Sequence, residues 1–257
     1  MRSALIFLYG VLCYAVFFLT FLYAIAFVAD VSFVPHTVNR GFATAGLTRA
    51  VVIDAILLGI FAVQHSGMAR RGFKKRLAGW MSPSIERSTY VLLSSLALIL
   101  LYWQWRPLPG VVWDVGRSWA WWLLYGLSAL GWLIVLSGTF AINHFDLFGL
   151  RQVWLRARGV AYTPPAFVDS FYYRIVRHPL MLGFIVAFWA IPRMTVGHLL
   201  FAIATTGYIL AAVRWLEERD LIAAHPEYRE YRHEVPMICP WPRPARRAER
   251  EFVPSRR

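Results

Sequence analysis

The sequence predicts an all-α, polytopic integral membrane protein: a helical bundle with five to six membrane segments that include a C-terminal helical hairpin. Hydrophobic residues make up 58% of the chain, aromatic residues 16% and charged residues only 16%, whereas soluble domains carry about 25% charged residues. Several apolar runs approach or exceed the roughly 20 residues that cross a bilayer. Basic residues gather in particular loops, as expected of membrane topology.

Four apolar runs predict the first four membrane segments, at residues 4–29, 50–63, 90–103 and 119–142. The apolar stretch 180–213 is too long for one span, and Pro192 and Arg193 interrupt it. Because proline breaks a helix interior, we expect two helices joined by a tight turn, the first of them short. The total is six segments, or five plus one of half length.

The loop between the second and third segments decides the orientation. It holds six of the basic residues, namely Arg70, Arg71, Lys74, Lys75, Arg76 and Arg87. The loops around Arg40 and around Arg106, Asp114 and Arg117 are nearly balanced in charge. Short loops rich in Lys and Arg stay in the cytoplasm, so both termini and the loop 145–177 are predicted to be cytoplasmic.

Composition and spacing exclude several classes of function. The formal net charge is +13, but the cations are spread over all the predicted cytoplasmic segments, so anionic membrane lipid explains them better than nucleic acid does. No zinc-ligand spacing occurs among the seven histidines, and we expect no metal site. Cys13 lies inside a predicted span and Cys239 in the tail, so no disulfide is expected. No sequence feature indicates an oligomeric state.

Polar residues at membrane depth are costly and mark candidate sites. The first cluster is Gln64-His65-Ser66, at the cytoplasmic end of the second segment. The second begins with Asn143-His144-Phe145-Asp146 and continues with Arg151-Gln152 at the mouth of the fourth segment. The plainer interpretation of the first cluster is a helix end that reaches interfacial water, whereas the second is unusually dense in hydrogen-bonding groups.

The third cluster joins two distant stretches, Arg177-His178-Pro179 and Glu217-Glu218. Because the helical hairpin returns the chain to the same membrane face, these stretches can meet. The basic turn offers donors to an anionic group and the glutamates offer acceptors to a cationic one, a combination that suits a small zwitterionic cofactor. In the plainer interpretation, Arg177 meets lipid phosphate, Pro179 starts a helix at N1, and Arg214 pairs with Glu218.

The C-terminal third resembles the cofactor module of the isoprenylcysteine carboxyl methyltransferase family. The residues that carry the resemblance are Arg177-His178-Pro179, Gly183, Glu217-Glu218-Arg219, Leu221, Tyr228, Tyr231 and Val235-Pro236. It implies that S-adenosylmethionine binds to Arg177, His178, Pro179, Leu180, Gly183, Glu217 and Glu218. The chain departs from the family pattern at Met181, where tyrosine is usual, and at His225-Pro226, where Phe-Gly is common.

This resemblance divides the chain into two parts. Residues 1–142 form a four-helix transmembrane part, and residues 143–257 comprise a cytoplasmic loop, the helical hairpin and the C-terminal cofactor-binding module.

A second resemblance extends over most of the chain. Gln64-His65-Ser66 with Met68-Ala69-Arg70, and the stretch from Asn143 to Gln152, are similar to the methanethiol S-methyltransferase branch, near the NnrU-like proteins. It implies an enzyme of the bacterial inner membrane that methylates methanethiol to dimethyl sulfide at the cytoplasmic face, by in-line transfer from S-adenosylmethionine.

The chemistry of thiol methylation indicates roles for the polar clusters. The attacking species is the thiolate, so a base or a cation nearby should help ionise the thiol. His65 is the first candidate base, Asp146 could orient it or take the proton, and Arg151 could stabilise the anion. Gln64, Asn143 and Gln152 are candidate substrate-binding residues.

Three other functions stay open on the sequence alone. One is a methyltransferase for a lipidated or phospholipid acceptor, which would need a tall groove between spans. Another is a non-enzymatic NnrU-like membrane protein whose polar clusters bind a partner or cofactor. The third is a reductase, because the cofactor module also has relatives among NADPH-dependent sterol reductases.

Overall fold

The computed structural model describes residues 2–43, 46–77, 79–165 and 171–240. Five helical stretches in this part are long and apolar enough to cross a membrane. They are α1 (Arg2–Val28), α2 (Leu47–Ala69), α4 (Pro83–Gln104), α5 (Trp119–Ile142) and the continuous stretch Val196–Ala224. A sixth apolar helix, α8 (Pro179–Trp189), has only 11 residues. The predicted polytopic bundle is confirmed, in its form with five full segments and one short one.

The last long stretch is built from three pieces: α9 (Val196–Ala212), the π-helical turn η2 (Val213–Glu217) and α10 (Glu218–Ala224). Short helices lie outside the spans. They are α3 (Arg71–Leu77), α6 (His144–Leu147), α7 (Leu150–Ala157), the 3-10 turn η1 (Phe171–Arg174) and α11 (Tyr228–Glu234).

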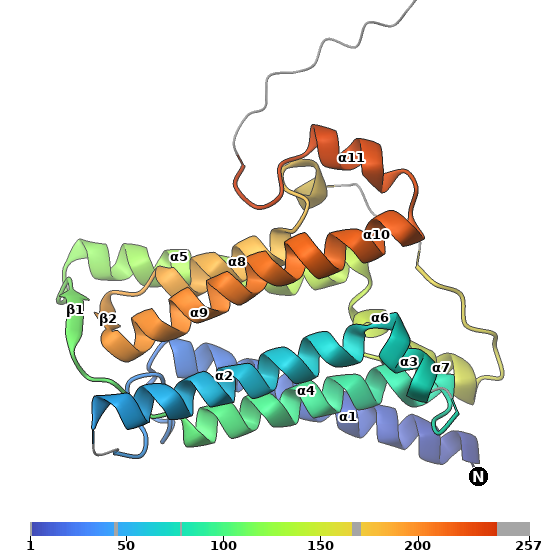
Figure 1. Cartoon of the computed structure of the whole chain (residues 1–257), viewed down its shortest axis with the longest axis horizontal. Helices are drawn as coiled ribbons and strands as arrows, with labels where there is room; N and C mark the ends of the chain where they lie inside the picture. The colour runs from blue at the N-terminus through green and yellow to red at the C-terminus, as the bar shows by residue number, and fades with distance from the viewer. Residues whose placement is uncertain (1, 44–45, 78, 166–170, 241–257) are drawn as a thin grey trace, which may run out of the picture.

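One small antiparallel sheet was not predicted. It pairs β1 (Val111–Asp114) with β2 (Arg193–Thr195). Proline and arginine at 192–193 end α8 as expected, and the strand pairing then ties this turn to the connection between α4 and α5. We call this the hairpin end of the bundle, and the opposite end, which carries α3, α6 and α7, the basic end (Figure 1).

The helices form two groups (Figure 1). In one, α4 packs against both α1 and α2, and α7 lies across α1 and α4. In the other, α5 and α8 make the closest pairing, and α9 lies beside α8 and α2. Helices from both sides of residue 142 therefore pack on one another. Aromatic and aliphatic side chains from α1, α4, α8 and α9 fill the space between the groups, with Phe27, Trp105 and Phe201 among those in contact.

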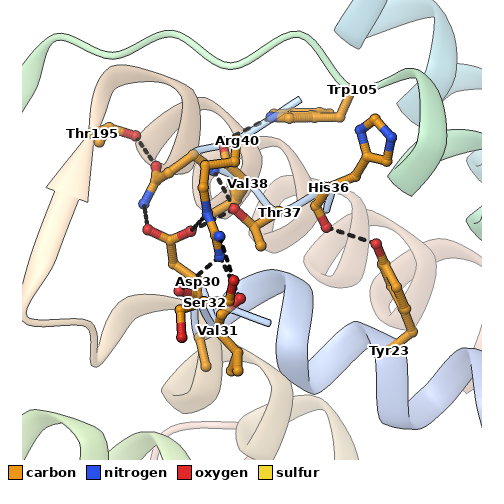
Figure 2. Close-up of polar contacts among 12 residues, drawn as sticks. Tyr23, Asp30, Val31, Ser32, His36, Thr37, Val38, Arg40, Trp105 and Thr195 are labelled. Carbon is orange, nitrogen blue, oxygen red and sulfur yellow. Dashed lines mark hydrogen bonds and ion pairs between the residues drawn. The ribbon is translucent and has the colours of Figure 1, made fainter. Parts of the chain in front are cut away.

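A polar network closes the hairpin end (Figure 2). Asp30 follows α1 with a φ of +53°, and its carboxylate accepts hydrogen bonds from Thr37 Oγ1 (2.5 Å), Asn39 Nδ2 (3.1 Å) and Arg40 Nε (3.2 Å). Thr195 of β2 donates to Asn39 Oδ1 at 2.6 Å. These bonds join the α1–α2 connection to the α8–α9 turn, far from the polar clusters of the basic end.

Candidate active site

The basic turn and the glutamate pair meet as the sequence predicts. Nη2 of Arg177 lies 2.7 Å from Oε1 of Glu218, and both side chains are buried, with 6% and 3% of their surface exposed. Glu218 therefore pairs with Arg177 and not with Arg214, one turn before it on the same helix. The backbone N–H groups of Arg177 and His178 donate to the carbonyls of Pro236 (2.9 Å) and Met237 (3.1 Å), so the segment after α11 holds the turn in place.

The π-helical turn η2 sets which glutamate faces inward. The N–H of Glu218 bonds to the carbonyl of Val213, five residues earlier, so η2 accommodates one more residue than an α-helical turn. The result is a buried Glu218 beside Arg177, while 44% of the Glu217 side chain is exposed. Single π turns inside α-helices are frequent at functional sites.

His178 connects the two glutamates. Its Nε2 lies 3.7 Å from Oε1 of Glu218, and its Nδ1 lies 3.6 Å from Oε1 of Glu217. Burial by itself would lower the pKa of His178, but the hydrogen bonds and negative charges of Glu217 and Glu218 raise it above its ordinary value. The ring is thereby favoured as a charged imidazolium.

Tyr228 of α11 completes this cluster. Its hydroxyl lies 3.3 Å from Nε2 of His178 and donates to Oε1 of Glu218 at 3.5 Å. Burial, reinforced by the charge of Glu218, raises the pKa of Tyr228, so the hydroxyl remains a donor. The C-terminal motif residue Tyr228 thus contacts both stretches of the cluster.

The other predicted cofactor residues lie on the packing side of α8. Pro179 begins α8 in its first turn. A Cβ on Gly183 would lie 2.7 Å from the carbonyl oxygen of Gly131, and one on Gly138 would lie 2.8 Å from Cδ1 of Leu180. The contact of α8 with α5 thus accounts for Gly183 and Leu180, and their role toward a cofactor stays a prediction.

His65 lies in an aromatic setting made by α2 and α4. Nδ1 lies 3.2 Å from Oγ of Ser94, and the Tyr90 hydroxyl lies 3.0 Å from both ring nitrogens. Phe61 stacks on the ring with centroids 5.1 Å apart. Tyr90 and Ser94 were not among the predicted site residues, although their spacing of four on one helix places them on one face.

The two residues next to His65 in the sequence also form polar contacts. Oγ of Ser66 lies 2.9 Å from the hydroxyl of Tyr208 on α9. Gln64 donates to the sulfur of Met68 at 3.2 Å, and its buried Oε1 accepts no hydrogen bond from the described residues. Gln64 therefore has an acceptor available to a small ligand.

Arg87 links His65 to the second polar cluster. Its guanidinium carbon lies 5.1 Å from the Tyr90 ring centroid, and its Nε donates to the Leu147 carbonyl at 2.6 Å. On the other side, Nη1 of Arg70 lies 3.4 Å from Oδ2 of Asp220, so the end of α2 that carries His65 lies beside the helix with the glutamate pair. Arg87 was predicted only as part of the basic loop that sets the topology, and not as a site residue.

The second cluster bonds mainly to itself. Asp146 Oδ1 pairs with Nη1 of Arg151 at 2.8 Å, Asp146 Oδ2 accepts from Tyr162 at 3.1 Å, and Gln152 Nε2 donates to the Asp146 carbonyl at 3.1 Å. Asn143, at a φ of +151°, caps the N–H of Asp146 at 3.1 Å. No hydrogen bond joins Asp146 to His65 within the described part of the chain.

His144, in the same cluster, is a packing residue. Its Nδ1 lies 2.8 Å from Oγ1 of Thr139 and its Nε2 lies 2.8 Å from the Tyr14 hydroxyl. Burial lowers the pKa of His144, which favours the neutral ring.

A cavity of about 790 Å³ lies beside this cluster at the basic end. Its lining comes from α3, the start of α4, α6, α7 and the stretch after α7, and includes Lys74, Glu86, Arg87, Asp146, Gln152 and Arg156.

Comparison with known proteins identifies the family of the chain. The family model described as NnrU protein matches residues 55–236, well over half of the chain. The chain belongs to the NnrU family. All three polar clusters of this NnrU-family protein lie inside the matched region.

Named relatives place the NnrU-family chain more narrowly. It is 57% identical to the methanethiol S-methyltransferase of Mycobacterium tuberculosis, over 94% of this chain and 98% of the relative. It is 52% identical to methanethiol S-methyltransferase 1 of Bradyrhizobium diazoefficiens, over 92% and 82%. Nurim of Mus musculus is 30% identical over 65% and 66%. These findings confirm the expected branch, and no solved structure matches the chain significantly.

Proposed function

We propose that this protein transfers a methyl group from S-adenosylmethionine to methanethiol or a similar small thiol, at the cytoplasmic face of a bacterial inner membrane. The observation that carries the proposal is similarity at 57% identity, along 94% of the chain, to a protein named methanethiol S-methyltransferase. The geometry of the basic end supports it, because it brings together groups suited to the donor and groups suited to the acceptor.

The Arg177–Glu218 cluster has the chemistry that the donor requires. S-adenosylmethionine supplies, when bound, a methyl group on a positively charged sulfur, and it also carries a carboxylate, an ammonium group and ribose hydroxyls. Arg177 and the imidazolium of His178 can bind the carboxylate, and Glu217 and Glu218 can accept from the ammonium or the hydroxyls. Glu217 is the most accessible of the four side chains.

His65 is our candidate for the base that takes the thiol proton. A methyl acceptor must lose its S–H proton as the new carbon–sulfur bond forms, and the thiolate is the effective nucleophile. Ser94 and Tyr90 hold the ring, so it is oriented before the substrate arrives. Phe61 stacks on the His65 ring and Tyr208 lies against Phe61, with ring centroids 6.2 Å apart. An aromatic wall of this kind favours a reaction that removes charge from the donor sulfur.

The remaining predicted residues keep supporting roles in this proposal. The carbonyl oxygen of the Gln64 side chain can accept a hydrogen bond from the thiol substrate. Asp146 and Arg151 neutralise each other, and with Asn143 and Gln152 they fix the stretch that follows α5. We propose that this stretch positions Arg87, which donates to the Leu147 carbonyl and packs on Tyr90. Through Tyr90, the same contacts help to hold the His65 ring.

One assay separates the candidate functions. Purified protein is incubated with methyl-labelled S-adenosylmethionine and, in turn, methanethiol, a prenylated cysteine and phosphatidylethanolamine. We expect label in volatile dimethyl sulfide. Label in the lipid extract instead would assign a lipid acceptor. Absence of both transfer and S-adenosylmethionine binding would contradict the proposal and favour a non-enzymatic protein.

A further inference from the structure

We propose that the 790 Å³ cavity at the basic end binds the headgroup of an anionic phospholipid that carries a hydroxyl group as well as a phosphate. The cavity lies between α3, the start of α4 and α7, and Arg177 and Glu218 are not among its lining residues. We call it the headgroup site. The inference stands independently of the methyl transfer proposed above.

The charges that line the headgroup site leave an excess of cations. Glu86 is neutralised by Lys74, at 3.8 Å, and Asp146 by Arg151, at 2.8 Å. Arg87 and Arg156 also line the cavity, and neither forms an ion pair with an acidic side chain in the described ranges. Planar guanidinium groups bind phosphate oxygens well, so the cavity favours a phosphate.

Gln152 indicates that the ligand also carries a donor. Its Nε2 donates to the Asp146 carbonyl at 3.1 Å, which fixes the orientation of the amide. Its Oε1 is then a buried acceptor with no hydrogen bond from the described residues. Buried polar atoms normally find a partner. A hydroxyl of the ligand would satisfy Oε1 while the phosphate contacts the arginines.

The surroundings of the headgroup site indicate a lipid and not a soluble phosphate. Phe73 on α3, Trp80 in the α3–α4 connection and Trp154 on α7 are exposed, Trp80 to 92%. Aromatic side chains of this kind are enriched at the headgroup level of a bilayer. α3 also connects the membrane spans α2 and α4, so the cavity lies at the ends of these spans, at the level expected of phospholipid headgroups.

A ligand bound in the headgroup site would also affect the position of the His65 ring. Arg87 lines the cavity and contacts Tyr90, whose hydroxyl lies 3.0 Å from the His65 ring. A phosphate bound to Arg87 would therefore fix the guanidinium that packs against the Tyr90 ring. This consequence adds to the inference and is not needed for the binding test.

The test measures lipid binding to the full-length protein in phosphatidylcholine nanodiscs, by native mass spectrometry or by displacement of a fluorescent lipid. Phosphatidylglycerol supplies phosphate and hydroxyls, phosphatidic acid supplies phosphate without the glycerol hydroxyls, and inorganic phosphate is the soluble competitor. We expect binding in the order phosphatidylglycerol, phosphatidic acid, phosphatidylcholine, with inorganic phosphate a weak competitor at best.

Two substitutions locate the binding. Arg156→Gln, at an exposed position, should weaken phosphatidylglycerol binding about fivefold, and Gln152→Met should remove the preference over phosphatidic acid. Arg158→Gln is the matched control, because it removes the same charge near the same helix end, at a residue that does not line the cavity.

Three outcomes would overturn the headgroup site. Equal losses in Arg156→Gln and Arg158→Gln would show diffuse attraction to an anionic surface and no site. Binding of phosphatidylcholine as tight as that of phosphatidylglycerol would contradict the charge argument. Full displacement by inorganic phosphate would assign the cavity to a soluble anion.

Discussion

At the residue scale, the buried Arg177–Glu218 pair is the feature most sensitive to change. Glu218→Gln keeps the size of the side chain but leaves Arg177 as a buried cation without its carboxylate. Breaking one side of a buried pair costs about 3 kcal/mol or more, so we expect a clear fall in the free energy of unfolding and weaker S-adenosylmethionine binding. Denaturation in detergent and calorimetry would measure the two effects.

Glu217→Gln is the control for that prediction. Its side chain is 44% exposed, and exposed pairs contribute about 1 kcal/mol at most, so the loss of stability should be small. Equal stability of the two variants would mean that Arg177 does not depend on Glu218.

The charge of His178 predicts a pH dependence. Burial opposes the charged ring, but Glu217 and Glu218 raise the pKa of His178 above the roughly 6.5 of an unfolded chain. A raised pKa stabilises the folded state fully below about pH 6.5, and this contribution disappears as the pH rises through the folded-state value. The difference in melting temperature between wild type and His178→Gln should therefore shrink from pH 6 to pH 9. A difference that is constant over this range would show that the ring is not charged in the folded protein.

His65 tests the proposed mechanism itself. His65→Ala should lower turnover at least about 100-fold, the usual contribution of a general base, while the dissociation constant for S-adenosylmethionine stays nearly unchanged. Steady-state production of dimethyl sulfide and calorimetry provide the two readouts. Unchanged turnover would remove His65 from the mechanism, whereas a lost cofactor affinity would assign it to the donor side.

At the element scale, α8 depends on α5. With 11 residues it is about 16 Å long, roughly half of the hydrocarbon core of a bilayer, so it cannot span alone. Gly131 and Gly183 let the two backbones touch, since a Cβ on Gly131 would lie 2.6 Å from the Gly183 carbonyl oxygen. Small residues at helix contacts in membranes permit this close approach.

Two alanine substitutions on α5 test this contact. Gly131→Ala should destabilise the protein by about 2 kcal/mol, in the range of overpacked cores. Gly126→Ala lies on the same helix with open space around the new Cβ, and it should be neutral or stabilising because alanine favours helix. Thermal unfolding of both variants gives the comparison, and equal effects would show that the close contact does not limit stability.

At the scale of the whole molecule, the orientation in the membrane decides whether the candidate site faces the cytoplasm or the outside of the cell. The proposed cytoplasmic position of the basic end rests on the basic loop at Arg70–Arg87. Cys239 is exposed and Cys13 is buried, so Cys239 is a natural reporter of the side on which the C-terminal segment lies. Residues 241–257 lie outside the described part of the chain.

A membrane-impermeant maleimide measures this orientation. We expect no labelling of Cys239 in intact cells and full labelling after permeabilisation. Val112→Cys, at an exposed position of β1 at the hairpin end, should show the opposite result by reacting in intact cells. Labelling of Cys239 in intact cells would place the candidate site outside and contradict the proposed function.

The sequence by itself determined the class of the molecule and the meeting of the basic turn with the glutamate pair. Apolar length is a local property, so the five spans and the half-length helix were predictable, and so was the break at Pro192 and Arg193. Two successive helices return the chain to the membrane face from which it started, so the number of helices alone predicts that Arg177 and the glutamate pair lie on the same face. The second segment was predicted too short, at residues 50–63, because α2 (Leu47–Ala69) continues through polar residues at both ends.

Only the tertiary structure decided which side chains act on each other. The π turn η2 selects Glu218 for burial, and regular helical spacing in the sequence does not reveal it. The contacts of Arg87, Tyr90 and His65 join α2 to α4, and Asp146 bonds to Arg151 within its own stretch. These choices follow from the packing of helices that are distant in sequence, because a buried hydrogen bond or ion pair depends on which groups the fold brings within a few ångströms.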